Sequence, residues 1–368
     1  MAQLTETTGR FPLAPRFRPA CRPLEDRVRR LGELAVQADD TADTTVASSV
    51  HNGAALLACD VGLHGLARKL CADHAEIFFA VRPLPGKEAC YSLAPLVNLA
   101  SLRIREDDAD QAFRMLHELN RAVAARADTT VDGITVPVGT LTATDADHTE
   151  MVRWMRGTFL FDGARALVRA GRWAQAHDHL ARPGTIGRRM FEGRQIAVLA
   201  LACGGDTEGA LDLIAATLPG DPWEATVTAC LAALCRRHAG HPAADPAPML
   251  DGYEQHQREP RFAVFDTRLG LSLIEAAGGT GQPAAASTAR SLIARTLEHG
   301  DGYAAREVLA HPGCSGLLTG TERERLTATV AACELGTELI PQQLRNGLTA
   351  ALERSRSVLV RSLAGKER

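Results

Sequence analysis

One spacing comes back five times in this chain and restricts how it can fold. A turn residue is followed by alanine five positions later and by an apolar residue four positions after that. A glycine or aspartate at the turn position can close a helix in a left-handed or side-chain-capped conformation. The alanine lets the next helix approach its neighbour closely, and the apolar residue one turn later enters the core. The five copies are Gly62/Ala67/Cys71, Asp107/Ala112/Leu116, Gly171/Ala176/Leu180, Gly205/Ala210/Ile214 and Gly300/Ala305/Leu309.

This pattern is typical of tetratricopeptide-type repeats, in which antiparallel helix pairs stack on one another. The clearest copy also has an aromatic residue, Trp173, two positions after Gly171. We therefore predict an all-α fold and, within that class, a tetratricopeptide-like α-solenoid. The solenoid is expected to span residues 23–340 as one continuous body.

Three segments depart from the repeat pattern. Residues 1–22 interleave prolines with arginines, which predicts a flexible arm. Residues 129–138 place β-branched residues around Asp132-Gly133, which predicts a small β-hairpin insertion. Residues 341–368 include an amphipathic helix that either caps the array or meets a partner, which includes a second copy of the chain in a homodimer.

Composition narrows the class of protein further. Aromatic residues make up only 4% of a chain that is 45% hydrophobic, which suits close helix packing better than a β-sandwich. The formal net charge of −3 gives no reason to expect nucleic acid as a partner. No apolar run is long enough to predict a membrane-spanning helix. The nine cysteines contain no CxxC pair, so we expect reduced thiols, a cytoplasmic location and no metal or other cofactor.

Polar side chains inside otherwise apolar helices are the candidates for function. In a solenoid, such residues on the inner helices of successive repeats converge on a concave face. Arginines on that face can hold a carboxylate or a phosphate through two hydrogen bonds. The expected substrate-binding residues are Asn52, Asn98, Asp162, Arg165, Arg188, Arg194, Trp223, Arg268 and Asp301.

Each candidate also has a purely structural interpretation. An aspartate at a helix start, such as Asp301, caps exposed N–H groups, and His51 with Asn52 can do the same at the start of their helix. The pair Asp162 and Arg165 can fix the register between two helices. For any single residue the structural interpretation is the favoured one, and the prediction of a binding face depends on the set as a whole.

Seven strings carry a resemblance to a known family. They are HNGAALLACDVGLHGLARKLC (51–71), LAPLVNLASLRIRE (93–106), DGARALVRAGRWAQA (162–176), GRRMFEGRQIAVLA (187–200), DPWEATVTACLAALC (221–235), FDTRLGLSLIEAAGG (265–279) and DGYAAREVLAH (301–311). Together they resemble an actinobacterial family of helical-repeat proteins, over about residues 44–335. Many members of that family carry an N-terminal helix-turn-helix domain, for which the Pro-rich residues before 44 are too few. Stand-alone members include the third component of class V lanthipeptide maturation, beside a kinase-like and a lyase-like protein.

The resemblance implies a precursor peptide as partner, together with the kinase-like and lyase-like maturation proteins. It also implies a lanthionine cyclase, in which a cysteine thiol adds to a dehydrated serine or threonine. That reaction needs a base and a proton donor, for which His51 and Tyr303 have suitable side chains. Arg306 would stabilise the enolate oxygen. The Cys-His-Gly and Trp-Cys motifs of zinc-dependent cyclases do not occur here, so a metal-independent enzyme is expected. The alternative is a non-enzymatic regulatory or scaffold module related to the sensor domains of helix-turn-helix regulators.

Overall fold

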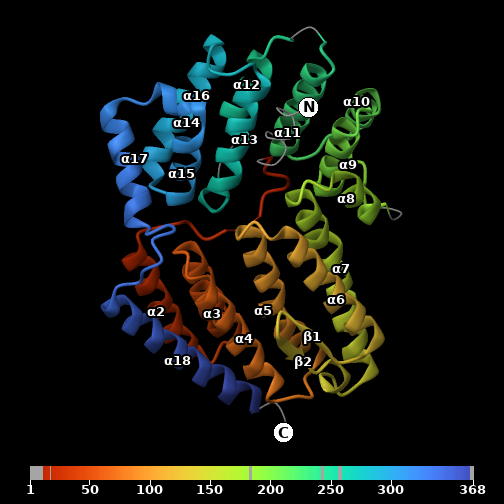
Figure 1. The fold of residues 1–368 in the computed structure, drawn as a ribbon, viewed down its shortest axis with the longest axis vertical. Helices are drawn as coiled ribbons and strands as arrows, with labels where there is room; N and C mark the ends of the chain where they lie inside the picture. Colours follow the sequence, from red (N-terminus) through yellow and green to blue (C-terminus); the bar gives the residue numbers. More distant parts are fainter. Residues whose placement is uncertain (1–10, 17, 182–184, 242–243, 256–258, 365–368) are drawn as a thin grey trace. The chain divides into compact units, whose positions relative to one another are not determined.

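The structure is a computed structural model that describes residues 11–16, 18–181, 185–241, 244–255 and 259–364 (Figure 1). These residues are mostly α-helical, with a single two-stranded sheet among them. The all-α prediction is therefore confirmed. The chain divides into two compact units: unit 1 comprises Met1–Pro23 and Gly171–Cys333, and unit 2 comprises Leu24–Ala170 and Glu334–Arg368.

This division differs from the predicted continuous body over 23–340. Unit 2 is completed by the C-terminal helix, whereas the N-terminal residues belong to unit 1. Local periodicity reports which neighbours along the chain stack, and it carries no signal for segments that meet across some 300 positions.

Unit 2 stacks its helices largely in chain order, with each helix packed against the next. The exception is α18, which packs against α2 and α3 and thereby buries Leu348, Val358 and Leu359. The apolar stripe of that helix is thus covered within the chain. The elements of unit 2 are α2 (Leu24–Thr41), α3 (Thr44–Asp60), α4 (His64–Phe79), α5 (Gly86–Arg105), α6 (Ala109–Ala125), β1 (Thr129–Val131), β2 (Ile134–Val136), the 3-10 helix η1 (Val138–Thr140), α7 (Asp145–Arg169) and α18 (Gln342–Ala364).

The predicted hairpin is confirmed between α6 and α7. Strands β1 and β2 are antiparallel, and Val131 pairs with Ile134 across the two-residue turn. Asp132 and Gly133 both have positive φ, at 50° and 82°, which fits the tight turn that Asp-Gly favours. Val131 and Val136 are buried, so the ribbon contributes one face to the core of unit 2.

Unit 1 arranges its helices in two layers. Helices α9, α11, α13 and α15 pack side by side, and we call them the α9–α15 layer; α12, α14 and α17 pack on the other side of the unit. The elements of unit 1 are α8 (Trp173–Leu180), α9 (Glu192–Cys203), α10 (Thr207–Ala215), α11 (Pro222–His238), α12 (Ala247–Gln255), the 3-10 helix η2 (Pro260–Phe262), α13 (Ala263–Ala276), α14 (Pro283–His299), α15 (Gly302–Ala310), α16 (Pro312–Leu317) and α17 (Gly320–Ala332).

The recurring spacing has the structural role that the sequence predicts. All five turn residues have positive φ, between 60° at Asp107 and 93° at Gly62. All five alanines are fully buried, and the apolar residues that follow them are buried except Leu309, which is half-buried. The small side chain therefore lies within the packing between helices.

The predicted flexible arm falls partly outside the described residues, namely at 1–10 and 17. Its other residues have neither helix nor strand, but Phe11, Leu13 and Cys21 are buried in unit 1. Apolar side chains between the prolines and arginines give this segment a means of packing that composition does not reveal. None of the helices in the part described has the length and apolar character needed to cross a bilayer.

Candidate functional site

The α9–α15 layer carries a buried acidic side chain at the start of each helix. Glu192 begins α9, Glu224 lies in the first turn of α11, Asp266 in that of α13, and Asp301 is the N-cap of α15. All four are less than one tenth exposed. Acidic groups are favourable at helix N-termini because they face unpaired N–H groups and the positive end of the helix dipole. Four such ends in one layer make one edge of unit 1 rich in acceptors.

Asp301 makes the most extensive contacts of this group. Its Oδ1 accepts hydrogen bonds from the backbone N–H groups of Tyr303 at 2.9 Å and Ala304 at 3.0 Å. Its Oδ2 accepts a third, from the backbone N–H of Cys21 at 2.9 Å. The predicted substrate-binding aspartate therefore caps its helix, as the structural interpretation has it, and also binds a distant segment of the chain.

Tyr303, the predicted proton donor, lies beneath that same segment. The Arg18 guanidinium is 3.5 Å from the centre of the Tyr303 ring, and the tyrosine is only 2% exposed. A guanidinium stacked on an aromatic face is a favourable cation–π contact. Arg306, the third predicted catalytic residue, is exposed one turn further along α15.

A small cavity of about 90 Å³ adjoins Asp301. Among its lining residues are Tyr253, Asp266, Arg295 and His299, so acidic, basic and phenolic groups share one space. Tyr253 is fixed there because its hydroxyl donates to the Asp266 carbonyl oxygen at 2.7 Å. The cavity can accept a small polar group that offers both hydrogen-bond donors and acceptors.

An aromatic row lies along the same layer. Trp223, a predicted binding residue, packs between Phe191 and Phe265, with ring centroids 6.2 Å and 5.8 Å away. The Arg189 guanidinium lies 4.6 Å from the centre of the Phe191 ring and also pairs with Glu224. The predicted tryptophan is thus adjacent to the acidic helix starts.

The other predicted residues of unit 1 have separate roles. Arg194 is buried and donates to the carbonyl oxygens of Gly187 and Leu213, both at 2.6 Å. It therefore links the segment before α9 to α10. Arg268 pairs with Glu307 through a 2.8 Å hydrogen bond and links α13 to α15. Arg188 is exposed. The structure therefore brings Trp223 and Asp301 to the edge of the α9–α15 layer and uses Arg194 for internal packing.

His51, the predicted base, lies inside unit 2. Its ring stacks on that of His74 with centroids 4.7 Å apart, and both side chains are buried. Burial, with a contribution from Arg356, lowers the pKa of His51 to about 4. Burial and the neighbouring His51 lower the pKa of His74 to about 3. Both imidazoles are neutral at neutral pH, and neither His51 nitrogen has a hydrogen-bond partner among the described residues.

The remaining predicted residues of unit 2 occupy two further positions. Asn98 Nδ2 donates to Asn52 Oδ1 at 2.9 Å, which joins α5 to α3. Asp162 and Arg165 lie one turn apart on α7, and both are half-buried. His51 and Asn52 are inside α3, whose N-cap is Asp43, so the capping interpretation of these two residues is wrong. Asp43 is a better cap because its carboxylate accepts from Thr45 and Val46.

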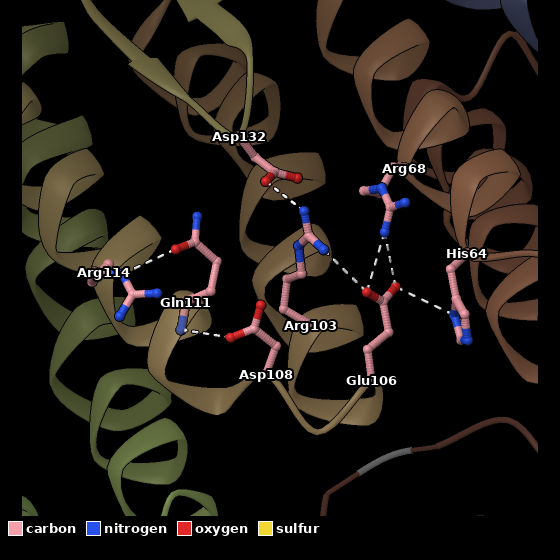
Figure 2. Close-up of polar contacts among 8 residues, drawn as sticks. All are labelled: His64, Arg68, Arg103, Glu106, Asp108, Gln111, Arg114 and Asp132. Carbon is pink, nitrogen blue, oxygen red and sulfur yellow. Dashed lines mark hydrogen bonds and ion pairs between the residues drawn. The ribbon is translucent and has the colours of Figure 1, made fainter.

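A polar cluster that the sequence did not predict lies around Glu106 (Figure 2). Arg68 and Arg103 donate to the Glu106 carboxylate at 3.2 Å, and His64 Nδ1 lies 3.3 Å from it. Arg103 also donates to Asp132 in the hairpin turn at 2.6 Å. The cluster ties the turn after α5 to α4 and to the hairpin, which is a structural role.

Several residues at these sites are absent from the predicted set because the local sequence gives them little weight. Glu192, Glu224 and Asp266 show the weak signal of an acid at the start of an apolar helix. His74, Arg18 and the Cys21 backbone gain their importance only through contacts with distant residues. Within the described ranges, no three His, Cys, Asp or Glu side chains are grouped so as to hold a metal ion.

The cysteines are buried, apart from the half-buried Cys203. Burial raises the pKa of Cys71 to about 12 and that of Cys90 to about 11. These thiols are therefore protonated and behave as small apolar side chains. No family model, curated protein or solved structure matches this chain.

Proposed function

We propose that this chain is a peptide-binding helical-repeat protein of tetratricopeptide type that acts in the maturation of a ribosomally made, lanthipeptide-like precursor. The observation that carries the proposal is the α9–α15 layer, where four helix starts present buried acids beside an aromatic row. Side chains from successive helices that converge on one edge suit an extended guest, because each repeat can contact a different residue of it.

The chemistry proposed for this site is thioether formation. The sulfur of a substrate cysteine adds to the β-carbon of a dehydrated serine or threonine, so a C–S bond forms. The thiol proton goes to a base, and a proton is delivered to the α-carbon, which leaves no net oxidation or reduction. Tyr303 is the proposed proton donor, and Arg306 on the same helix the group that stabilises the enolate oxygen. His51, the base predicted from the sequence, belongs to unit 2 and is not counted among the groups of this site.

A second candidate is a non-enzymatic scaffold related to the sensor modules of regulators. The burial of His51 and Tyr303 favours it, since both side chains are at most 5% exposed. A group that transfers a proton must come within hydrogen-bond reach of the reacting atom. In this conformation His51 faces His74, and Tyr303 faces Arg18.

The test is to incubate the full chain with a dehydrated precursor peptide and then alkylate the remaining thiols. The mass of the peptide is measured by mass spectrometry. We expect one alkyl adduct fewer for each ring formed, relative to a control without protein. Tyr303→Phe should slow the reaction on the order of 100-fold. Tyr91→Phe, at a half-buried tyrosine of α5, is the matched control and should keep the full rate.

Two negative outcomes have different meanings. If the precursor binds but every thiol can still be alkylated, the chain acts as a scaffold and the proposed cyclase activity is rejected. If no precursor peptide binds the folded chain at all, the proposed function is rejected in both forms.

A further inference from the structure

Unit 1 already holds a segment of chain against the α9–α15 layer. That segment, which we call the arm, consists of residues 11–16 and 18–23 and has neither helix nor strand. It precedes α9 by more than 160 positions, so its contacts with the layer join segments that are far apart in the sequence. The contacts resemble those of a bound peptide in three respects.

First, the backbone N–H and the backbone carbonyl oxygen of one arm residue are both hydrogen-bonded to the start of α15. The Cys21 N–H donates to Asp301 at 2.9 Å, and the Cys21 carbonyl oxygen accepts from the Gly302 N–H at 2.9 Å. The same oxygen accepts from the Cys333 thiol at 3.2 Å. A Cβ at Gly302 would lie 2.5 Å from Cys333 Sγ, so only glycine permits this close approach.

Second, the arginines of the arm interact with acidic and aromatic side chains of the layer. Arg16 pairs with the buried Glu192 at 3.4 Å, and Arg18 lies over Tyr303 at 3.5 Å. Arg22 donates to the His299 carbonyl oxygen at 2.6 Å. Side chains at intervals along the segment thus meet different helices, which is how a repeat surface recognises an extended ligand.

Third, the contacts of the arm extend across the α9–α15 layer. Arg16 reaches α9 and Arg18 reaches α15, the first and last helices of the layer. Two arginines close together in the arm therefore contact the two outermost helices of the layer.

We propose that the arm is an intramolecular ligand, and that it occupies the surface on which unit 1 binds a guest peptide that is itself extended and carries arginine. This inference rests on the peptide-binding half of the proposed function and adds the site, the class of guest and a form of self-inhibition. A tethered segment has an effective concentration in the millimolar range for its own site. A guest must compete with it, so binding is weak until the arm is released.

The test uses the full chain and a fluorescein-labelled synthetic peptide with the sequence of residues 11–23, with serine at the cysteine position. Fluorescence polarisation measures its binding to wild type, to R16A/R18A and to R29A. Arg29 is exposed on α2 and pairs with Asp26 and Glu33 of the same helix, so R29A is the matched control. We expect R16A/R18A to bind the labelled peptide at least tenfold more tightly than the other two proteins. A peptide lacking both arginines should bind at least tenfold less tightly.

Thiol mapping by mass spectrometry shows whether the arm has been released. In R16A/R18A, alkylation of the buried Cys21 should become at least tenfold faster. Cys230, a fully buried residue of α11, should stay protected. If Cys21 becomes reactive but the peptide binds no more tightly than to wild type, the arm is a structural strap and the inference is overturned. It is likewise overturned if Cys21 stays protected and no protein binds the peptide.

Failure of this inference and failure of the proposed function give different results. If the arm peptide does not bind but a precursor peptide does, only the inference falls. If the arm peptide binds and no precursor does, the proposed role in peptide maturation falls, and the site remains one for arginine-containing peptides.

Discussion

The buried candidate residues of the two units are stabilised in different ways. Unit 2 encloses two imidazoles, His51 and His74, stacked on each other and lacking a charge at neutral pH. Unit 1 encloses carboxyl groups such as Glu192 and Asp301 and surrounds them with arginine or backbone N–H groups. A buried polar group is tolerated when it loses its charge or gains partners. Only the second leaves hydrogen-bond acceptors that another segment can pair with, as the arm does at Asp301.

The largest effect that tests this contrast is the response of unit 2 to acid. The histidine pKa values are lowered on folding, so the unfolded chain binds protons first as the pH falls. Stability should be complete above about pH 6.5 and decline as the pH falls toward 4 and then 3. Between pH 7.5 and pH 5 we expect a loss of about 2 kcal/mol for each histidine. Arg356 opposes the protonation of His51, and Asp73 favours it.

Urea unfolding at the two pH values measures this loss. Trp154 lies in unit 2, and W173F/W223F removes the other two tryptophans, both in unit 1, so that its fluorescence reports unit 2 alone. In the same background, H51L/H74L should show a much smaller difference between pH 7.5 and pH 5. An equal difference with and without the histidines would show that the pair does not govern the acid response.

The next effect concerns the acidic edge of unit 1. Asp301→Ala removes an acceptor for three backbone N–H groups, two in its own helix and one in the arm. We expect unit 1 to lose about 3 kcal/mol, since hydrogen bonds to charged groups are worth more than neutral ones. Asp178→Ala, at a largely exposed aspartate of α8, is the control and should be neutral within about 0.5 kcal/mol. A loss of similar size in both variants would contradict the role given to Asp301.

The smallest effect compares the turn residues of the repeat. Unit 1 has glycine at its three copies, whereas unit 2 has Asp107 at φ 60° in one of its two. Asp107→Gly relieves a left-handed conformation at a residue with a Cβ, and it also makes the unfolded chain more flexible. We expect a net gain of about 0.5 kcal/mol in thermal or urea unfolding. Gly171→Asp should have the opposite sign, and a loss in both variants would show that Asp107 has a further role.

The helical class, the hairpin and the repeat alanines were all predictable because their signals are local. Each depends on residues within about ten positions: a glycine that permits positive φ, an alanine one helix further on, or Asp-Gly between β-branched residues. The candidate site was predictable only in part. The structure brings Asp301 and Trp223 into the same unit, but Glu192 and Asp266 look like ordinary helix-start acids until the layer aligns them.

The sequence by itself determined which stretches become helices, where they turn and which small side chains lie between them. The tertiary structure decided that α18 completes unit 2, that His51 stacks on His74, and that the arm lies against Asp301 and Tyr303. The physical reason is that backbone conformation is set by near neighbours, whereas burial, charge pairing and pKa depend on whatever the folded chain brings close.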